Sequence, residues 1–291
     1  MSVADPTTAS APAALVSTDW AREHLHDPKV RFLEVDVDTD AYDTGHLPGA
    51  TGINWKSQLT DSVVRDLVSR EELQSLLRAA GVDDDTRIVL YGDNNNWFAA
   101  WAYWQLRYQG LDNVSLLDGG RIKVEADGLP LTTDAPSHPE GSITLPDRTR
   151  EELRAYREQV IDGAGSARDL VDVRSPEEFR GELAAPAHLP QEAAQRRGHI
   201  PGAVNVPWST AVAEDGTFKP IEQLRELYGA KGVSGEDEVV AYCRIGERSS
   251  HTWFVLHELL GYRNVRNYDG SWTEYGSLVG VPIEVGEASA N

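Results

Sequence analysis

The sequence predicts an α/β protein of two similar domains in tandem, each a mainly parallel sheet flanked by helices. Short β-branched runs alternate with amphipathic stretches along the chain, a pattern typical of parallel strands joined by helices. The motif Gly-His-Leu-Pro-Gly-Ala at 45–50 returns as Gly-His-Ile-Pro-Gly-Ala at 198–203, which indicates an internal repeat. A segment rich in Pro and Ser separates the two copies. We therefore expect domains at 15–133 and 147–286, joined by a linker at 134–146.

The first domain carries a local signal for each of its elements. Ser69 and Glu72 are spaced as a capping box and Gly81 follows the apolar pattern, so a helix is predicted up to residue 80. The later patterns predict a strand at 86–91, a helix near 96–109 and a strand at 113–117. Residues 1–15 are rich in Ala, Ser, Thr and Pro and lack the apolar centre of a secretory signal, so we expect a disordered tail.

The second domain shows the same alternation. Thr149 and Glu152 have the spacing of a capping box, which predicts a helix beginning there. Ser175 is followed by Pro176, which is typical of the first turn of a short helix. The remaining patterns predict a strand at 167–173, a helix at 220–229, a strand at 237–242 and a helix at roughly 248–260.

Composition and charge narrow the class of protein. No apolar run approaches the roughly 20 residues that a membrane span needs. The net charge of −20 makes nucleic acid and anionic membranes poor partners, and a small anionic substrate would need cations placed locally. The single cysteine forms no internal disulfide and no cysteine metal cluster, so we expect a cytoplasmic protein.

That cysteine, Cys243, is the most informative residue. It follows a predicted strand and precedes a predicted helix, so its sulfur should meet unpaired backbone amides and the positive end of the helix dipole. Arg244 and Arg248 add positive charge nearby. We therefore expect a lowered thiol pKa and a reactive thiolate. The alternative is a buried structural cysteine, the common fate of a free thiol.

The repeat separates features of the fold from features of the chemistry. Asp36 and Asp172 occupy matched positions, as do His46 and His199, which favours structural hydrogen bonding over acid–base catalysis. The halves diverge at the cysteine, because Gly92 stands where the second copy has Cys243. The arginines that follow the cysteine have no counterpart there either. The first domain is therefore predicted to be catalytically silent and to form one wall of the site.

The chain resembles a two-domain rhodanese, a sulfurtransferase with an inactive first and an active second domain. The resemblance rests on the duplicated Gly-His-(Leu/Ile)-Pro-Gly-Ala turn, the cysteine loop, and Tyr-Asp-Gly-Ser-Trp at 268–272. It implies two tandem rhodanese-like domains and a loop whose backbone amides cradle the sulfur. The substrate-binding residues that it implies are those of the loop: Arg244, Ile245, Gly246, Glu247, Arg248 and the adjacent Ser249.

The resemblance also implies a mechanism. Cys243 would attack the outer sulfur of thiosulfate, release sulfite and keep a persulfide. Cyanide or a thiol acceptor, such as a thioredoxin-like protein, would then remove that sulfur. No metal or organic cofactor is implied.

Two departures from the family bear on the sulfur donor. Relatives that use 3-mercaptopyruvate have Gly and then a small hydroxylated residue after the cysteine; Arg244 and Ile245 here favour thiosulfate. Thiosulfate enzymes of the family carry a Lys where this chain has Ile245 and an Arg where it has Glu178. Arg174, Arg180 or Arg197 could supply the missing cation, or each could be a solvated surface charge.

Some alternatives stay open. The second domain has an insertion at 180–197, which is either a lid over the site or a neutral loop. A phosphatase of the related cysteine–arginine type is disfavoured, because it places five residues between Cys and Arg and this chain has four between Cys243 and Arg248. Two other functional hypotheses are a 3-mercaptopyruvate sulfurtransferase and a sulfur-relay or redox protein that holds a persulfide without turnover.

Overall fold

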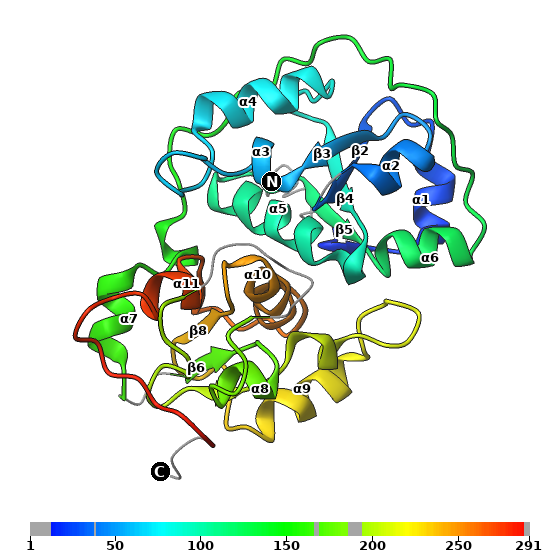
Figure 1. Ribbon diagram of the computed structural model, residues 1–291. Helices are drawn as coiled ribbons and strands as arrows, with labels where there is room; N and C mark the ends of the chain where they lie inside the picture. The colour runs from blue at the N-terminus through cyan, green and yellow to red at the C-terminus, as the bar shows by residue number, and fades with distance from the viewer. Residues whose placement is uncertain (1–12, 38, 166–168, 186–193, 288–291) are drawn as a thin grey trace, which may run out of the picture.

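The computed structural model describes residues 13–37, 39–165, 169–185 and 194–287, which form two α/β domains (Figure 1). In the first, five parallel strands lie in the order β1-β5-β4-β2-β3, and in the second, four lie in the order β7-β6-β8-β9. The strands of the first sheet are β1 Leu15–Val16, β2 Val30–Asp36, β3 Thr51–Asn54, β4 Arg87–Tyr91 and β5 Val114–Leu117. Those of the second are β6 Asp169–Asp172, β7 Val204–Asn205, β8 Val239–Tyr242 and β9 Val265–Tyr268. The predicted α/β class with duplicated parallel sheets is confirmed.

Helices cover these sheets. Those of the first domain are α1 Thr18–His24, α2 Asp40–Thr44, α3 Trp55–Gln58, α4 Arg70–Ala79, α5 Trp97–Tyr108 and α6 Gly120–Ala126. Those of the second are α7 Arg157–Gly163, α8 Pro176–Phe179, α9 Ile221–Gly229, α10 Glu247–Phe254 and α11 Ser271–Tyr275. A π-helical turn, Val255–Leu259, continues α10 close to the predicted end. Within the described ranges, no helix has the length and apolar character that crossing a bilayer requires.

Two predicted segments differ from the structure. Most of the predicted tail, residues 1–12, lies outside the described residues, but Leu15 pairs with Leu116 in the sheet. The helix predicted from Thr149 is wrong. The Thr149 hydroxyl donates to the Glu151 carboxylate at 2.6 Å, and only a single 3-10 turn forms at Glu151–Leu153. The chain then extends, and the helix begins at Arg157.

The segment 134–146 lies along the first domain (Figure 1). The backbone N–H of Ile143 donates to the Val82 carbonyl at 3.1 Å, and that of Gly141 donates to the Arg78 carbonyl at 2.8 Å. Ile143 and Leu145 are buried in the hydrophobic core. These apolar side chains explain why a segment of linker-like composition packs in place instead of spanning open solvent.

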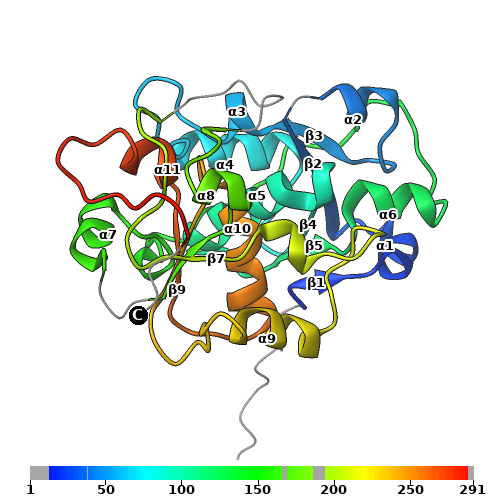
Figure 2. The same cartoon turned by 60° about the horizontal axis from the view of Figure 1, so that its bottom comes forward.

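The two domains share one continuous core, centred where α5 meets α10. The two helices meet near the middle of the molecule (Figure 2), and both contribute to the same hydrophobic core. Tyr103 packs edge-on against Phe254 with ring centroids 4.8 Å apart, and Trp97 lies 5.2 Å from Trp208. Every residue of α10 is buried. The first domain therefore closes over the helix that follows Cys243 and keeps water away from it.

Candidate active site

Cys243 lies directly after β8, at the start of a tight loop that leads into α10. The sulfur accepts a hydrogen bond from the backbone N–H of Gly246 at 3.1 Å. Gly246 has φ +103°, and a Cβ there would lie 2.6 Å from the Trp101 ring, so this position requires glycine. The loop can therefore bend its amides toward the sulfur only because position 246 has no side chain.

A carboxylate also faces the sulfur. The Cys243 thiol donates to Glu247 Oε2 at 3.5 Å, and both residues are buried. Burial, and then the charge of Glu247, raise the pKa of Cys243, while Arg248 and the amides of Ser249 and Gly246 act in the opposite direction. The predicted lowering of this pKa is wrong, because the cysteine is fully enclosed beside an acidic side chain. The Cys243 thiol therefore has the Glu247 carboxylate in contact as a hydrogen-bond acceptor.

Arg248 is held by a second carboxylate. Its guanidinium donates to both oxygens of Glu178, at 2.9 and 3.1 Å, and both side chains are buried. Burial alone would raise the pKa of Glu178, but the charge and hydrogen bonds of Arg248 offset this and leave it lowered. Glu178 occupies the position at which the resemblance implied an arginine in thiosulfate enzymes. Here that position supplies a partner for the loop arginine instead of a second cation.

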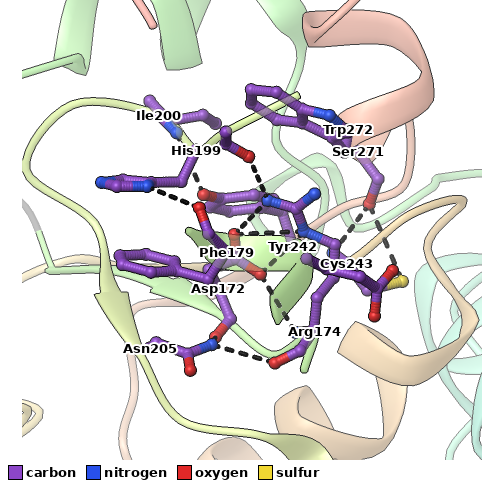
Figure 3. A network of polar contacts seen from close by, with 12 residues as sticks. Asp172, Arg174, Phe179, His199, Ile200, Asn205, Tyr242, Cys243, Ser271 and Trp272 are labelled. Carbon is purple, nitrogen blue, oxygen red and sulfur yellow. Dashed lines mark hydrogen bonds and ion pairs between the residues drawn. The ribbon is translucent and has the colours of Figure 1, made fainter. Parts of the chain in front are cut away.

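The other predicted arginines lie in different surroundings. Arg174 is buried, pairs with Asp172 at 2.6 Å, donates to the Gly198 carbonyl at 2.7 Å and stacks on Trp272 (Figure 3). It ties the end of β6 to the turn at 198–203. Arg197 is exposed and donates to the Glu182 carbonyl at 3.1 Å. The guanidinium groups of both arginines thus have protein partners.

Three further residues of the loop or beside it were predicted to bind substrate. Arg244 is buried, and its carbonyl accepts from the Thr273 N–H at 2.9 Å. Ile245 lies at the mouth of the loop, where it lines a cavity. The Ser249 hydroxyl lies 2.6 Å from Asn267 Oδ1 and 2.9 Å from the Gly246 carbonyl oxygen, and these two acceptors share its one proton. Ser249 thus anchors the loop to β9 through its side chain and faces the sulfur through its amide.

Part of the insertion at 180–197, residues 186–193, lies outside the described residues. Its C-terminal end is docked on the rest of the second domain. Trp272 donates its indole N–H to the Arg196 carbonyl at 3.0 Å, and the Arg196 N–H donates to the Gly276 carbonyl at 3.0 Å. This end of the insertion therefore packs against the segment that follows β9.

The matched histidines have the structural role that the repeat predicts. His46 Nδ1 lies 2.9 Å from the Tyr42 carbonyl oxygen, and its ring stacks on Tyr42 with centroids 3.8 Å apart. His199 Nδ1 lies 2.8 Å from the Phe179 carbonyl oxygen, and its ring stacks on Phe179 at 3.6 Å. The same geometry in a domain without a cysteine confirms that these rings fix a turn.

Ser271 is a site residue that sequence reasoning missed. Its hydroxyl accepts from the Cys243 backbone N–H at 3.0 Å and donates to the Tyr268 carbonyl at 2.7 Å, beside the sulfur (Figure 3). It has φ +51°, while its counterpart Gly120 has φ +54°. At this position both domains have a left-handed backbone conformation. The first domain has a glycine there and the second has a serine. The Gly120–Ser271 difference is visible in the sequence and was a usable signal.

This strain leads to a prediction about stability. We expect Ser271→Gly to be more stable than Ser271→Ala by about 1 kcal/mol, because both lose the hydroxyl but only alanine keeps a side chain at positive φ. Urea unfolding of the two variants measures the difference. At most other positions a glycine variant is less stable than an alanine variant. If Ser271→Gly were no more stable than Ser271→Ala, the proposed backbone strain at position 271 would be contradicted.

A cavity of about 180 Å³ opens beside the loop, between the domains. Ile245 and Asp269 line it from the second domain, and Trp55, Lys56 and Trp101 line it from the first. The sequence predicts that the first domain forms a wall of the site, but these three residues were not predicted to line it. Their approach to the loop depends on how the domains pack, which no local pattern reveals.

The cysteine loop, its amide cradle and the duplicated sheets define a class of protein. Residues 17–126 and 149–278 each match the family described as Rhodanese-like domain, so the chain belongs to the rhodanese-like family. It is 58% identical over 274 residues to "Putative thiosulfate sulfurtransferase" of Mycolicibacterium smegmatis, covering 94% of this chain and 98% of that protein. It is 55% identical to "Sulfur carrier protein TtuD" of Thermus thermophilus, covering 95% and 98% of the two chains.

A solved structure agrees with the fold. The crystal structure of YnjE superposes with a TM-score of 0.81 at 26% identity, covering 96% of this chain and 70% of that one.

Proposed function

We propose that this protein is a sulfurtransferase that moves the outer sulfur of thiosulfate to a thiol acceptor, or to cyanide in an assay, through a persulfide on Cys243. The observation that carries the proposal is the position of the Cys243 sulfur, 3.1 Å from a loop amide and 3.5 Å from the Glu247 carboxylate. The names of the two relatives, one a thiosulfate sulfurtransferase and one a sulfur carrier, support the same chemistry.

In the first half-reaction, Glu247 takes the thiol proton of Cys243 as thiosulfate arrives. The thiolate attacks the outer sulfur, the S–S bond of thiosulfate breaks, and sulfite leaves with the electron pair. A persulfide anion remains on Cys243. The loop amides stabilise this anion as an oxyanion hole stabilises oxygen, and Arg248 contributes positive charge from its place beside Glu178.

In the second half-reaction, an acceptor thiolate or cyanide attacks the outer sulfur of the persulfide. The Cys243 thiolate leaves and recovers its proton from Glu247. The product is an acceptor persulfide or thiocyanate. Because the sulfur is covalently held between the steps, a protein acceptor such as a thioredoxin-like thiol protein can receive it without free sulfide.

Steady-state kinetics test the proposal against its rivals. We expect kcat/KM for thiosulfate to exceed that for 3-mercaptopyruvate by at least about tenfold, which corresponds to roughly 1.4 kcal/mol of discrimination. A higher kcat/KM for 3-mercaptopyruvate would identify the protein as a 3-mercaptopyruvate sulfurtransferase. A single burst of one sulfur per Cys243, with no turnover when cyanide or a small thiol is supplied, would assign a carrier instead.

A further inference from the structure

The cavity beside the cysteine loop is built mainly by the domain that lacks a cysteine. Two of its lining residues, Ile245 and Asp269, come from the second domain and the rest come from the first. A Cβ on Gly246 would lie 2.6 Å from the ring of Trp101, which shows how closely the first domain approaches the amide that binds the sulfur. A molecule in this cavity therefore touches the first domain while it faces the loop.

Two of the arginines predicted to bind a donor are paired with buried carboxylates. Arg248 is paired with Glu178 and Arg174 with Asp172, and all four side chains are buried. Each guanidinium would have to leave a buried carboxylate to bind a second anion directly, which is costly. Since the protein carries a net charge of −20, a dianion such as thiosulfate still needs positive charge close by.

Two cations of the first domain lie in the cavity wall, Lys56 and Arg65. Three carboxylates share that wall. Asp66 and Asp269 are both bound by Arg154, at 2.6 and 2.8 Å, whose single positive charge offsets one of their two negative charges. Asp61 is turned onto its own loop, where it accepts from the amides of Val63 and Val64 at 2.7 and 2.9 Å.

Two residues of the cavity wall carry buried hydrogen-bond donors that lack an acceptor. Trp55 and Trp101 line it and are only 6% and 3% exposed. Neither indole N–H has a hydrogen-bond partner among the described residues. An unpaired buried N–H is unfavourable, and a ligand with several oxygen atoms could supply the acceptors.

We propose that Lys56 and Arg65 bind the anionic end of the sulfur donor, so that the domain without a cysteine determines donor selectivity. This inference rests on the proposed function. The sulfonate end of thiosulfate lies toward the first domain, and its outer sulfur is directed past Ile245 toward Cys243. The sulfite that leaves is therefore released into the cavity, on the side away from the persulfide.

Kinetics of three variants test this inference. Lys56→Gln and Arg65→Gln are each expected to raise KM for thiosulfate roughly fivefold, with kcat little changed, because they remove binding without touching the reacting atoms. The double variant should also lose most of the ionic-strength dependence of kcat/KM. The rate at which a neutral S-alkyl thiosulfonate converts Cys243 to a mixed disulfide, with loss of a sulfinate, should be the same in all variants. Lys29→Gln, which removes a first-domain lysine paired with Asp85 on the surface, is the matched control.

Binding to a protein that cannot react separates this inference from the proposed function. Calorimetric titration of thiosulfate into Cys243→Ser should show weaker affinity once Lys56→Gln and Arg65→Gln are added. That result supports the inference even if the wild type shows no turnover with thiosulfate, in which case only the proposed function fails. Equal affinity in the two proteins, or an unchanged KM in the double variant, would overturn the inference.

Discussion

Glu247→Gln is expected to form the Cys243 persulfide about 10² to 10³ times more slowly than the wild type at neutral pH. The carboxylate lies 3.5 Å from the sulfur, and a positioned proton acceptor typically contributes a factor of this size. The amide is isosteric but does not accept the thiol proton. Stopped-flow measurement of a single turnover with excess thiosulfate gives the rate directly.

The pH dependence of the same variant distinguishes a base from a residue that only holds the loop. Burial and the charge of Glu247 raise the pKa of Cys243, so removing the carboxylate lowers that pKa. The thiol must then lose its proton to water. The rate for Glu247→Gln should therefore rise about tenfold per pH unit until the thiol pKa is reached, whereas the wild type changes less. Glu247→Asp keeps a carboxylate and should retain part of the rate. A glutamine variant as fast as the wild type at every pH would exclude Glu247 as the base.

Arg248→Met is expected to lower both stability and reactivity. It leaves Glu178 as an unpaired buried carboxylate, which typically costs about 3–5 kcal/mol of unfolding free energy. It also removes the charge that acts to lower the pKa of Cys243. Urea unfolding and the single-turnover rate measure the two effects.

The double variant Glu178→Leu with Arg248→Met separates these effects. Replacing both members of a buried ion pair by apolar side chains of similar size is often close to neutral for stability. We therefore expect the double variant to recover most of the lost stability and to remain slow in persulfide formation. If the double variant formed the persulfide as fast as the wild type, Arg248 would serve only to pair with Glu178.

Much of the fold could be predicted because its signals are local or repeated. The Ser69 capping box forms as expected, with the Glu72 N–H donating to Ser69 Oγ at 3.2 Å. The 198–203 turn recurs at the same place in both sheets because glycine and proline dictate its backbone. Thr149 shows the limit of such signals. Its spacing to Glu152 suits a cap, but its hydroxyl is engaged by Glu151 instead.

The electrostatics of the site could not be predicted from local sequence. Glu178 and Arg248 are 70 positions apart, and their pairing depends on α8 packing against the cysteine loop. Whether the pKa of Cys243 is raised or lowered depends on burial. The flanking arginines suggest a lowered pKa, but full enclosure of the thiol raises it. Glu247 was recognised as a member of the loop, but the loop's curvature is what turns its carboxylate toward the sulfur.

The mass of the peptide that contains Cys243, measured after the protein is incubated with thiosulfate and desalted, tests the central claim most directly. We predict a gain of one sulfur atom on that peptide, its loss on addition of cyanide, and no gain in Cys243→Ser. An unmodified Cys243 peptide in protein that meanwhile converts thiosulfate and cyanide to thiocyanate would contradict a persulfide on this residue.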